Sequence, residues 1–355
     1  MIKLRHIPII AVILLVGIIV GPARAQAPAP VEIFEPEYRL AVPGYQYAFP
    51  RDHGAHPDFK LEWWYYTGHL DAEDGQSFGY ELTFFRIGMD RRAVNPSTWT
   101  VDNLHVAHFG LSRLSEGEFQ YWERVNRAGP GIAHARTDTL DVQNESWTAT
   151  LEDGVMHLRA YADGVLLELE LEQDKEPVIH GNGVSQKADG VGQASHYYSM
   201  TRMGTEGLLS IDGQAISVSG ESWMDHEFGT NQLAANQVGW DWFSLQLDNG
   251  EELMLYRLRH TDGTIDRNSS GTIVAVDGAT EHVDRDQFSV RSLRDWESPK
   301  SEAVYGLDWE LALPEHATHL RVIPLMDDQE LYTVRSTGIA YWEGAVRVEG
   351  IWKGE

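Results

Sequence analysis

The feature that most constrains the fold is a repeated alternation of apolar and polar residues. From Val165 to Glu172 the order is Val-Leu-Leu-Glu-Leu-Glu-Leu-Glu, which places leucines on one face of an extended strand and glutamates on the other. This segment follows Val155 to Tyr161 across Ala162-Asp163-Gly164, where glycine suits the positive φ of a tight turn. Such segments recur between turn signals, and no long amphipathic helix is evident. The sequence therefore predicts an all-β fold built from antiparallel barrels or sandwiches.

An internal repeat indicates that two related β domains follow one another. The aromatic hairpin expected at Leu61 to Arg86 is similar to the one expected at Gly239 to Arg259, and Trp63 aligns with Trp240. We therefore predict an N-terminal β domain over residues 37–231 and a C-terminal β domain over residues 232–355.

A second match in the repeat concerns the end of each copy. The segment from Glu206 to Gly213 aligns without a gap on Glu343 to Gly350. In the first copy a further strand follows and ends at Glu227, but its counterpart would lie beyond residue 355. Either the second copy lacks its last strand or the sequence is a shortened version of a longer one.

The first 25 residues have the pattern of a secretory signal peptide. Lys3 and Arg5 precede an apolar run from Ile9 to Gly21, and Ala23-Arg24-Ala25 forms a small-x-small cleavage site. The run is shorter than the ~20 residues that a spanning helix needs. We predict cleavage after Ala25, an extended leader over residues 26–36, and a periplasmic or secreted protein without a stable membrane anchor.

Charge and missing motifs exclude several functions. The chain has 28 Lys and Arg against 54 Asp and Glu, a net charge of −26 that repels phosphate backbones, so we expect no nucleic-acid partner. It has no cysteine, which removes disulfides, thiolate metal sites and cysteine nucleophiles. Motifs of serine hydrolases, nucleotide-binding loops and HExxH metalloproteases are absent from the sequence.

Two histidine pairs are the candidates for a metal site. His105 and His108 lie three residues apart on a predicted strand, so their side chains point to opposite faces. His53 and His56 lie in a predicted loop and could approach one ion, but no matching carboxylate or third histidine is evident. Because a zinc site needs three or four ligands, we expect no metal and no cofactor.

The segment that most strongly indicates acid–base chemistry is Trp223-Met224-Asp225-His226-Glu227. On a strand, Trp223, Asp225 and Glu227 share one face, with the two carboxyl groups about 7 Å apart. If that face is dry, burial and like charge keep one of the acids protonated near neutral pH. The alternative is that this face meets solvent and Trp223 is only partly covered. His226 points to the opposite face and is a weaker candidate.

Four successive aromatic residues, Trp63 to Tyr66, place two large rings on each face of another strand. One face can pack in a core, and the other can line a cavity for a flat or elongated apolar ligand. The alternative is that the rings only fill two small cores. The candidate ligand-binding residues are His53, Glu62, Trp63, Trp64, Tyr65, Tyr66, Tyr197, His226, Glu227 and Trp240.

At these residues the chain resembles a known family. The segments Asp52-His53-Gly54, Glu62 to Leu70, Gly79 to Arg86 and Gly220 to Gly229 are similar to motifs of the carotenoid 1,2-hydratase and AttH family. The resemblance implies two tandem lipocalin-like β-barrels of the calycin type. Some relatives hydrate carotenoid double bonds, and many are described as predicted secreted hydrolases or are encoded beside transporter genes.

The resemblance also implies catalytic positions. Asp225 matches the acidic position of the family, Trp223 its aromatic neighbour, and Tyr198 lies where an upstream aromatic is expected. Hydration of an alkene needs a neutral acid that protonates carbon, and the faces of aromatic rings can stabilise the resulting carbocation.

Three hypotheses about function follow. The first is a hydratase acting on an isoprenoid or lipid, and the second is a non-catalytic carrier of an apolar ligand for an envelope ABC transporter. The third is a hydrolase, which the missing nucleophile and metal motifs disfavour.

Overall fold

The computed structural model describes residues 38–89, 101–231 and 233–355. These residues form twenty-three strands and three short 3-10 helices, with no α-helix among them, so the predicted all-β class is confirmed. The predicted signal peptide at 1–25 and the leader at 26–36 lie outside the described residues. Within the described part of the chain, no helix is long and apolar enough to cross a membrane.

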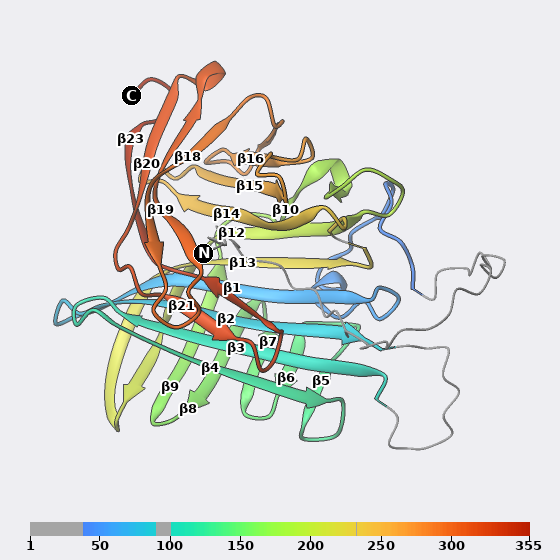
Figure 1. Cartoon of the computed structure of the whole chain (residues 1–355). Coiled ribbons are helices and arrows are strands. Elements are labelled where there is room, and N and C mark those ends of the chain that lie inside the picture. The colour runs from blue at the N-terminus through green and yellow to red at the C-terminus, as the bar shows by residue number, and fades with distance from the viewer. Residues whose placement is uncertain (1–37, 90–100, 232) are drawn as a thin grey trace, which may run out of the picture.

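One large antiparallel sheet contains every strand up to residue 229 (Figure 1). Its order is β4-β3-β2-β1-β13-β12-β9-β8-β7-β6-β5, and the short β10 and β11 also pair with β12. The bounds are β1 (Leu61–Ala72), β2 (Ser77–Gly88), β3 (Asn103–Arg113), β4 (Glu118–Arg127), β5 (Ala133–Ala135), β6 (Asp141–Asn144), β7 (Trp147–Glu152), β8 (Val155–Ala162), β9 (Val165–Gln173), β10 (Val178–Ile179), β11 (Ser185–Gln186), β12 (Ala194–Ile211) and β13 (Gln214–Gly229).

The large sheet curls into a nearly closed barrel, so that side chains bridge the region of β3 and β4 at one end and β6 near the other end. Asn144 of β6 donates from Nδ2 to the backbone oxygen of His105 on β3, at 3.1 Å. Arg124 of β4 donates from Nη1 to the backbone oxygen of Asn144, at 2.9 Å. The interior holds a large apolar cluster that includes Trp64, Leu82, Phe109, Trp147 and Leu169.

The alternation in β9 is as the sequence predicts. Leu167, Leu169 and Leu171 are buried, whereas Glu170 and Glu172 are exposed. The turn before β9 has positive φ at both Asp163 (43°) and Gly164 (86°), and this twist suits a two-residue hairpin turn.

The C-terminal half forms two four-stranded sheets, β14-β15-β16-β17 and β18-β19-β20-β23, and the hairpin β21-β22. Figure 1 shows these sheets stacked above β13 and β1 of the large sheet. A separate apolar core, including Phe243, Leu255, Leu311 and Val322, lies between the two sheets. The bounds are β14 (Gln237–Gln246), β15 (Glu252–His260), β16 (Ser270–Val274), β17 (Thr280–Val283), β18 (Ser289–Glu297), β19 (Val304–Leu313), β20 (Thr318–Pro324), β21 (Glu330–Thr333), β22 (Ile339–Trp342) and β23 (Val346–Ile351).

Both hairpins of the predicted repeat are present, as β1–β2 and β14–β15. Trp63 lies opposite Phe85 in the first hairpin, and Trp240 lies opposite Leu258 in the second. The sheets change between Gly229 and Gln237, an interval that includes the expected boundary at 231/232. The division into two domains stays a prediction. Strands β14 and β23 are both end strands of their sheets.

Candidate functional site

The pairing of β1 with β13 sorts the predicted site residues onto two faces of the sheet. Tyr65 lies directly opposite Asp225, and Trp64 lies opposite His226. Because successive side chains of a strand point to opposite faces, these two pairs face opposite ways. The four aromatic residues are therefore divided, with Trp63 and Tyr65 on one face and Trp64 and Tyr66 on the other.

The face of Asp225 borders a cavity of about 1240 Å³ that lies between the large sheet and the C-terminal sheets. Of the residues predicted from the sequence, those that line it are Trp63, Tyr65, Tyr197, Trp223, Asp225, Glu227 and Trp240. The cavity continues between β14 and β23, where its wall includes the apolar Phe243, Leu245, Leu320, Val322 and Val346 as well as Asp241, Arg347 and Glu349. It thus has a polar part at β1 and β13 and a part richer in apolar side chains in the C-terminal half, called the apolar part below.

Asp225 lies in the polar part and is only 5% exposed. Its Oδ1 accepts hydrogen bonds from Trp223 Nε1 at 2.7 Å and from the hydroxyl of Ser199. Its Oδ2 accepts one from the hydroxyl of Tyr197 at 3.0 Å. Burial raises the pKa of Asp225 to about 7, although these three donors favour the ionised form. Asp225 is therefore partly protonated near neutral pH.

Glu227, the other acid on this face, has a different environment. The Nζ of Lys187 lies 3.1 Å from its Oε1, and Ser195 donates a hydrogen bond to the same oxygen. Lys187 also lies over the ring of Tyr256, 4.4 Å from the ring centroid. Glu227 thus forms a buried ion pair, whereas the side chains that hydrogen-bond to Asp225 in the described part of the chain are all neutral.

A further acid of the same cavity, Glu343, follows β22 and was not among the residues predicted from the sequence. The hydroxyl of Tyr65 donates a hydrogen bond to Glu343 Oε1. Burial, and then the charge of Asp225, raise the pKa of Glu343 to about 7. The internal repeat aligns Glu343 with Glu206, and Glu206 is exposed on β12. The repeat therefore gave no indication that Glu343 is buried.

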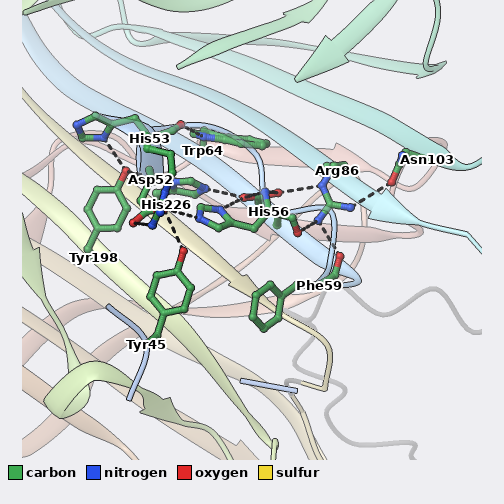
Figure 2. A network of polar contacts seen from close by, with 12 residues as sticks. Tyr45, Asp52, His53, His56, Phe59, Trp64, Arg86, Asn103, Tyr198 and His226 are labelled. Carbon is green, nitrogen blue, oxygen red and sulfur yellow. Dashed lines mark hydrogen bonds and ion pairs between the residues drawn. The ribbon is translucent and has the colours of Figure 1, made fainter. Parts of the chain in front are cut away.

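The opposite face carries a buried polar network, drawn in Figure 2. The hydroxyl oxygen of Tyr198 lies 2.7 Å from Nδ1 of His53 and 3.0 Å from Nδ1 of His226. Nε2 of His226 lies 2.9 Å from Oε1 of Glu62. Trp64 stacks on His226 and donates from Nε1 to the backbone oxygen of His53, at 2.9 Å. The network fixes the 3-10 helix η1 (Arg51–His53), which ends at His53, to β1, β12 and β13.

Glu62 is the centre of this network. Arg86 Nε lies 2.8 Å from its Oε2, and His56 Nδ1 lies 2.7 Å from its Oε1. Burial alone would raise the pKa of Glu62, but Arg86, His226 and His56 hold it well below its usual range. Glu62 therefore stays ionised, in contrast to Asp225.

Three residues of this network offer a metal-type donor set. One donor atom from each of His56, Glu62 and His226 lies within 4.8 Å of the others. The fold thus supplies the carboxylate and the further histidine that the sequence did not reveal near His56. However, these atoms already bond one another, and the Arg86 guanidinium lies against Glu62. A cation would have to replace those bonds, so we assign the network a structural role.

The structure places Tyr198 away from Asp225, which differs from the expectation. Strand β12 pairs with β13 so that Tyr198 lies opposite His226 and Ser199 lies opposite Asp225. The side chain of Tyr198 therefore shares the face of the polar network, and its neighbour Tyr197 reaches Asp225 instead. Tyr66 also lies on the face of Tyr198, inside the barrel, and its hydroxyl contacts the sulfur of Met156. We call this side of β1 and β13 the inner face, and the side of Asp225 the cavity face.

These observations define an all-β protein in which a nearly closed barrel sheet and two smaller sheets enclose an aromatic cavity that contains buried acids. The chain belongs to the AttH-like family, whose model matches residues 40–355. No curated protein matches the chain.

Solved structures are similar over most of the chain. An AttH from Nitrosomonas europaea is 34% identical, with a TM-score of 0.80, and the match covers 88% of this chain and 95% of that one. Kievitone hydratase from Nectria haematococca is 17% identical, with a TM-score of 0.65 and coverage of 89% and 92%. CghA, solved with Sch210972, is 14% identical, with a TM-score of 0.52 and coverage of 84% and 85%. The last two likenesses show the fold alone.

Proposed function

We propose that this chain is an exported hydratase that adds water to a carbon–carbon double bond of an isoprenoid or lipid ligand, with Asp225 as the proton donor. The observation that carries the proposal is the environment of Asp225, a buried acid in an aromatic cavity with a pKa raised to about 7. A general acid works best when its pKa lies near the working pH. The name of the kievitone hydratase neighbour supports hydration as a reaction of this fold.

The hydrogen bonds of Asp225 indicate which oxygen holds the acidic proton. Oδ1 accepts from both Trp223 and Ser199, whereas Oδ2 accepts only from Tyr197. The proton of the neutral acid therefore belongs on Oδ2. From there it can pass to a double bond bound in the polar part of the cavity.

Aromatic rings surround the place where a carbocation would form. The ring of Trp242 meets that of Trp223 edge to face at 6.2 Å and that of Tyr65 at 5.4 Å. A desolvated cation over such a ring gains ~2 kcal/mol. The apolar part of the cavity, between β14 and β23, would hold the rest of an elongated ligand.

A non-catalytic carrier is the second candidate, because an aromatic cavity of this size is sufficient for binding. In that case Asp225 would only orient a ligand, and an envelope ABC transporter would be the expected partner.

A hydrolase has less support. Ser199 lies between His180 and Asp225, with its Oγ 2.7 Å from Nε2 of His180. It donates to the acid, so histidine does not activate it as in a Ser-His-Asp triad.

Conversion of lycopene, an acyclic carotenoid, and of kievitone by purified protein tests the proposal. We expect the parent to form products heavier by one water, and Asp225→Asn to lower the rate by about 10²- to 10⁴-fold while ligand binding, read from tryptophan fluorescence, is retained. Asp58→Asn, at an exposed position, is the matched control. A parent that binds these molecules without converting them favours the carrier, and mass spectrometry of copurifying apolar molecules would then identify its cargo.

A further inference from the structure

We infer that Glu343 is a second catalytic residue, the base that takes a proton from the attacking water, and that Tyr65 holds it in place. This inference rests on the proposed hydration, and it adds the base, which the proposed function does not identify.

The fold brings Glu343 to the cavity from outside the large sheet. Its backbone N–H donates to the backbone oxygen of Gln329 at 3.0 Å, which fixes the segment between β22 and β23. Its Oε1 accepts a hydrogen bond from the hydroxyl of Tyr65. Tyr65 lies directly opposite Asp225 on the neighbouring strand. The two acids therefore approach the same region of the cavity from two separate parts of the chain.

Glu343 also has a free acceptor. Among the described residues, only Tyr65 forms a hydrogen bond to its carboxyl group, and none forms an ion pair with it. Glu227, by contrast, is paired with Lys187. Oε2 of Glu343 is thus available to accept a hydrogen bond from a water molecule in the cavity.

The two acids affect each other's protonation. The charge of Asp225 adds to burial in raising the pKa of Glu343, and the pKa of each lies at about 7. When two acids are coupled in this way, the pair can hold one proton in either of two arrangements, and the arrangement with Asp225 neutral and Glu343 ionised is the reactive one. One neutral and one ionised acid is the combination that hydration needs. Glu81 lies in the same cavity, but burial raises its pKa well above the usual range, so it stays neutral and is a poor base.

The steps balance without any other reagent. The Asp225 carboxyl gives its proton to one alkene carbon, whose π electron pair forms the new C–H bond, and the other carbon becomes a cation. The oxygen of water forms the C–O bond while one of its protons passes to the Glu343 carboxylate. Transfer of that proton through water to Asp225 restores the starting state, and nothing is oxidised or reduced.

The test separates protonation of carbon from capture of water. Parent, Glu343→Gln and Asp225→Asn proteins are incubated in D2O with lycopene and with kievitone, and alcohol and recovered alkene are analysed by mass spectrometry. We expect Glu343→Gln to form alcohol at least about 10²-fold more slowly. It should still incorporate deuterium into the recovered alkene, because Asp225 can deliver a deuteron to carbon and the cation can then lose a protium to the Asp225 carboxylate. Asp225→Asn should do neither.

Two further variants serve as controls, one for the effect of a Glu-to-Gln change at an exposed position and one for misfolding of Glu343→Gln. Glu297→Gln, at an exposed position of β18, is the matched control and should behave as the parent. Tyr65→Phe keeps the Glu343 carboxyl but removes its hydrogen bond, and should slow alcohol formation about 10-fold with deuterium exchange intact. It keeps the inference testable if Glu343→Gln fails to fold.

Each outcome has a distinct meaning. Full alcohol formation by Glu343→Gln would overturn the role of Glu343 and leave the proposed hydration standing. Loss of both alcohol and deuterium exchange in a folded Glu343→Gln protein would also overturn the base role, since a base for water is not needed for protonation. A parent that shows neither reaction would overturn the proposed function, and the inference with it.

Discussion

The two faces of the β1–β13 strand pair carry buried carboxyl groups with opposite properties. Glu62 and Asp225 are 1% and 5% exposed, so burial hardly distinguishes them. Arg86 and two histidines surround Glu62 and hold its pKa well below the usual range. Asp225 has only neutral donors, and burial raises its pKa to about 7. The difference teaches that the charge of the partners, more than burial, decides whether an acid here is structural or reactive.

The same contrast extends to neighbouring side chains. On the inner face, Tyr198 joins two histidines in a network with few free atoms. On the cavity face, Tyr197 bonds an acid that can still give up a proton. The inner face therefore stabilises the fold, and the cavity face is the one suited to chemistry.

Removal of the charge of Glu62 should produce the largest change in stability. Glu62→Gln leaves the Arg86 guanidinium buried without its counter-ion, which costs about 3–5 kcal/mol when such a pair is broken. Urea denaturation at pH 7 measures the loss, with the exposed Glu297→Gln as the control. A loss below about 1 kcal/mol would show that the network does not depend on this charge.

The pH dependence of this effect has a definite sign. The pKa of Glu62 is lower in the folded protein than its usual value of about 4.5, so its contribution is present above that pH. It is lost as the pH falls through the lower pKa of the folded state. The parent and Glu62→Gln should therefore approach equal stability in strong acid, provided both remain folded there.

Asp225→Asn should have the opposite effect and stabilise the protein at pH 8. The folded chain holds the Asp225 proton up to about pH 7, whereas the unfolded chain releases it near 3.8. The parent therefore loses stability as the pH rises between these values, and Asn does not titrate. The gain at pH 8 should be at most about 4 kcal/mol, since each pKa unit corresponds to 1.36 kcal/mol. Thermal melts of both proteins at pH 5 and pH 8 measure it, and a variant less stable than the parent at pH 8 would contradict the account.

Tyr197 and Tyr198 are adjacent in the chain and give the most direct comparison of the two faces, with the smallest expected loss of stability. Tyr198→Phe leaves ring nitrogens of His53 and His226 without their partner, a loss of about 1–3 kcal/mol in stability with little effect on ligand binding. Tyr197→Phe removes one donor to Asp225, so it should cost about 1 kcal/mol and raise the pKa of Asp225 further. Denaturation and a pH–rate profile distinguish the two, and equal effects would mean that the faces are not separate.

Local patterns were enough to predict the strands and which residues share a face. The alternation of β9 and the grouping of Trp223, Asp225 and Glu227 depend only on the two-residue period of a strand, and both are observed. The aromatic hairpins at β1–β2 and β14–β15 follow from the repeat in the same way.

The long-range parts of the site could not be predicted from the sequence. Which of Tyr197 and Tyr198 reaches Asp225 depends on the register between β12 and β13. The ion pair of Glu227 needs Lys187, and the second acid needs the C-terminal segment that carries Glu343 to Tyr65. These contacts depend on the register between strands and on segments that are far apart in the chain, and no periodicity encodes either.

The central claim is that Asp225 keeps its proton up to about pH 7, whereas Glu62 is already ionised there. Carbon-13 NMR of protein labelled at aspartate and glutamate side-chain carboxyls, with Asp225→Asn and Glu62→Gln used to assign the signals, measures both titrations in one sample. The account predicts a midpoint at about pH 7 for Asp225 and no titration of Glu62 down to its usual pKa of about 4.5. An Asp225 signal that titrates at or below its ordinary value of about 3.8 would contradict the account.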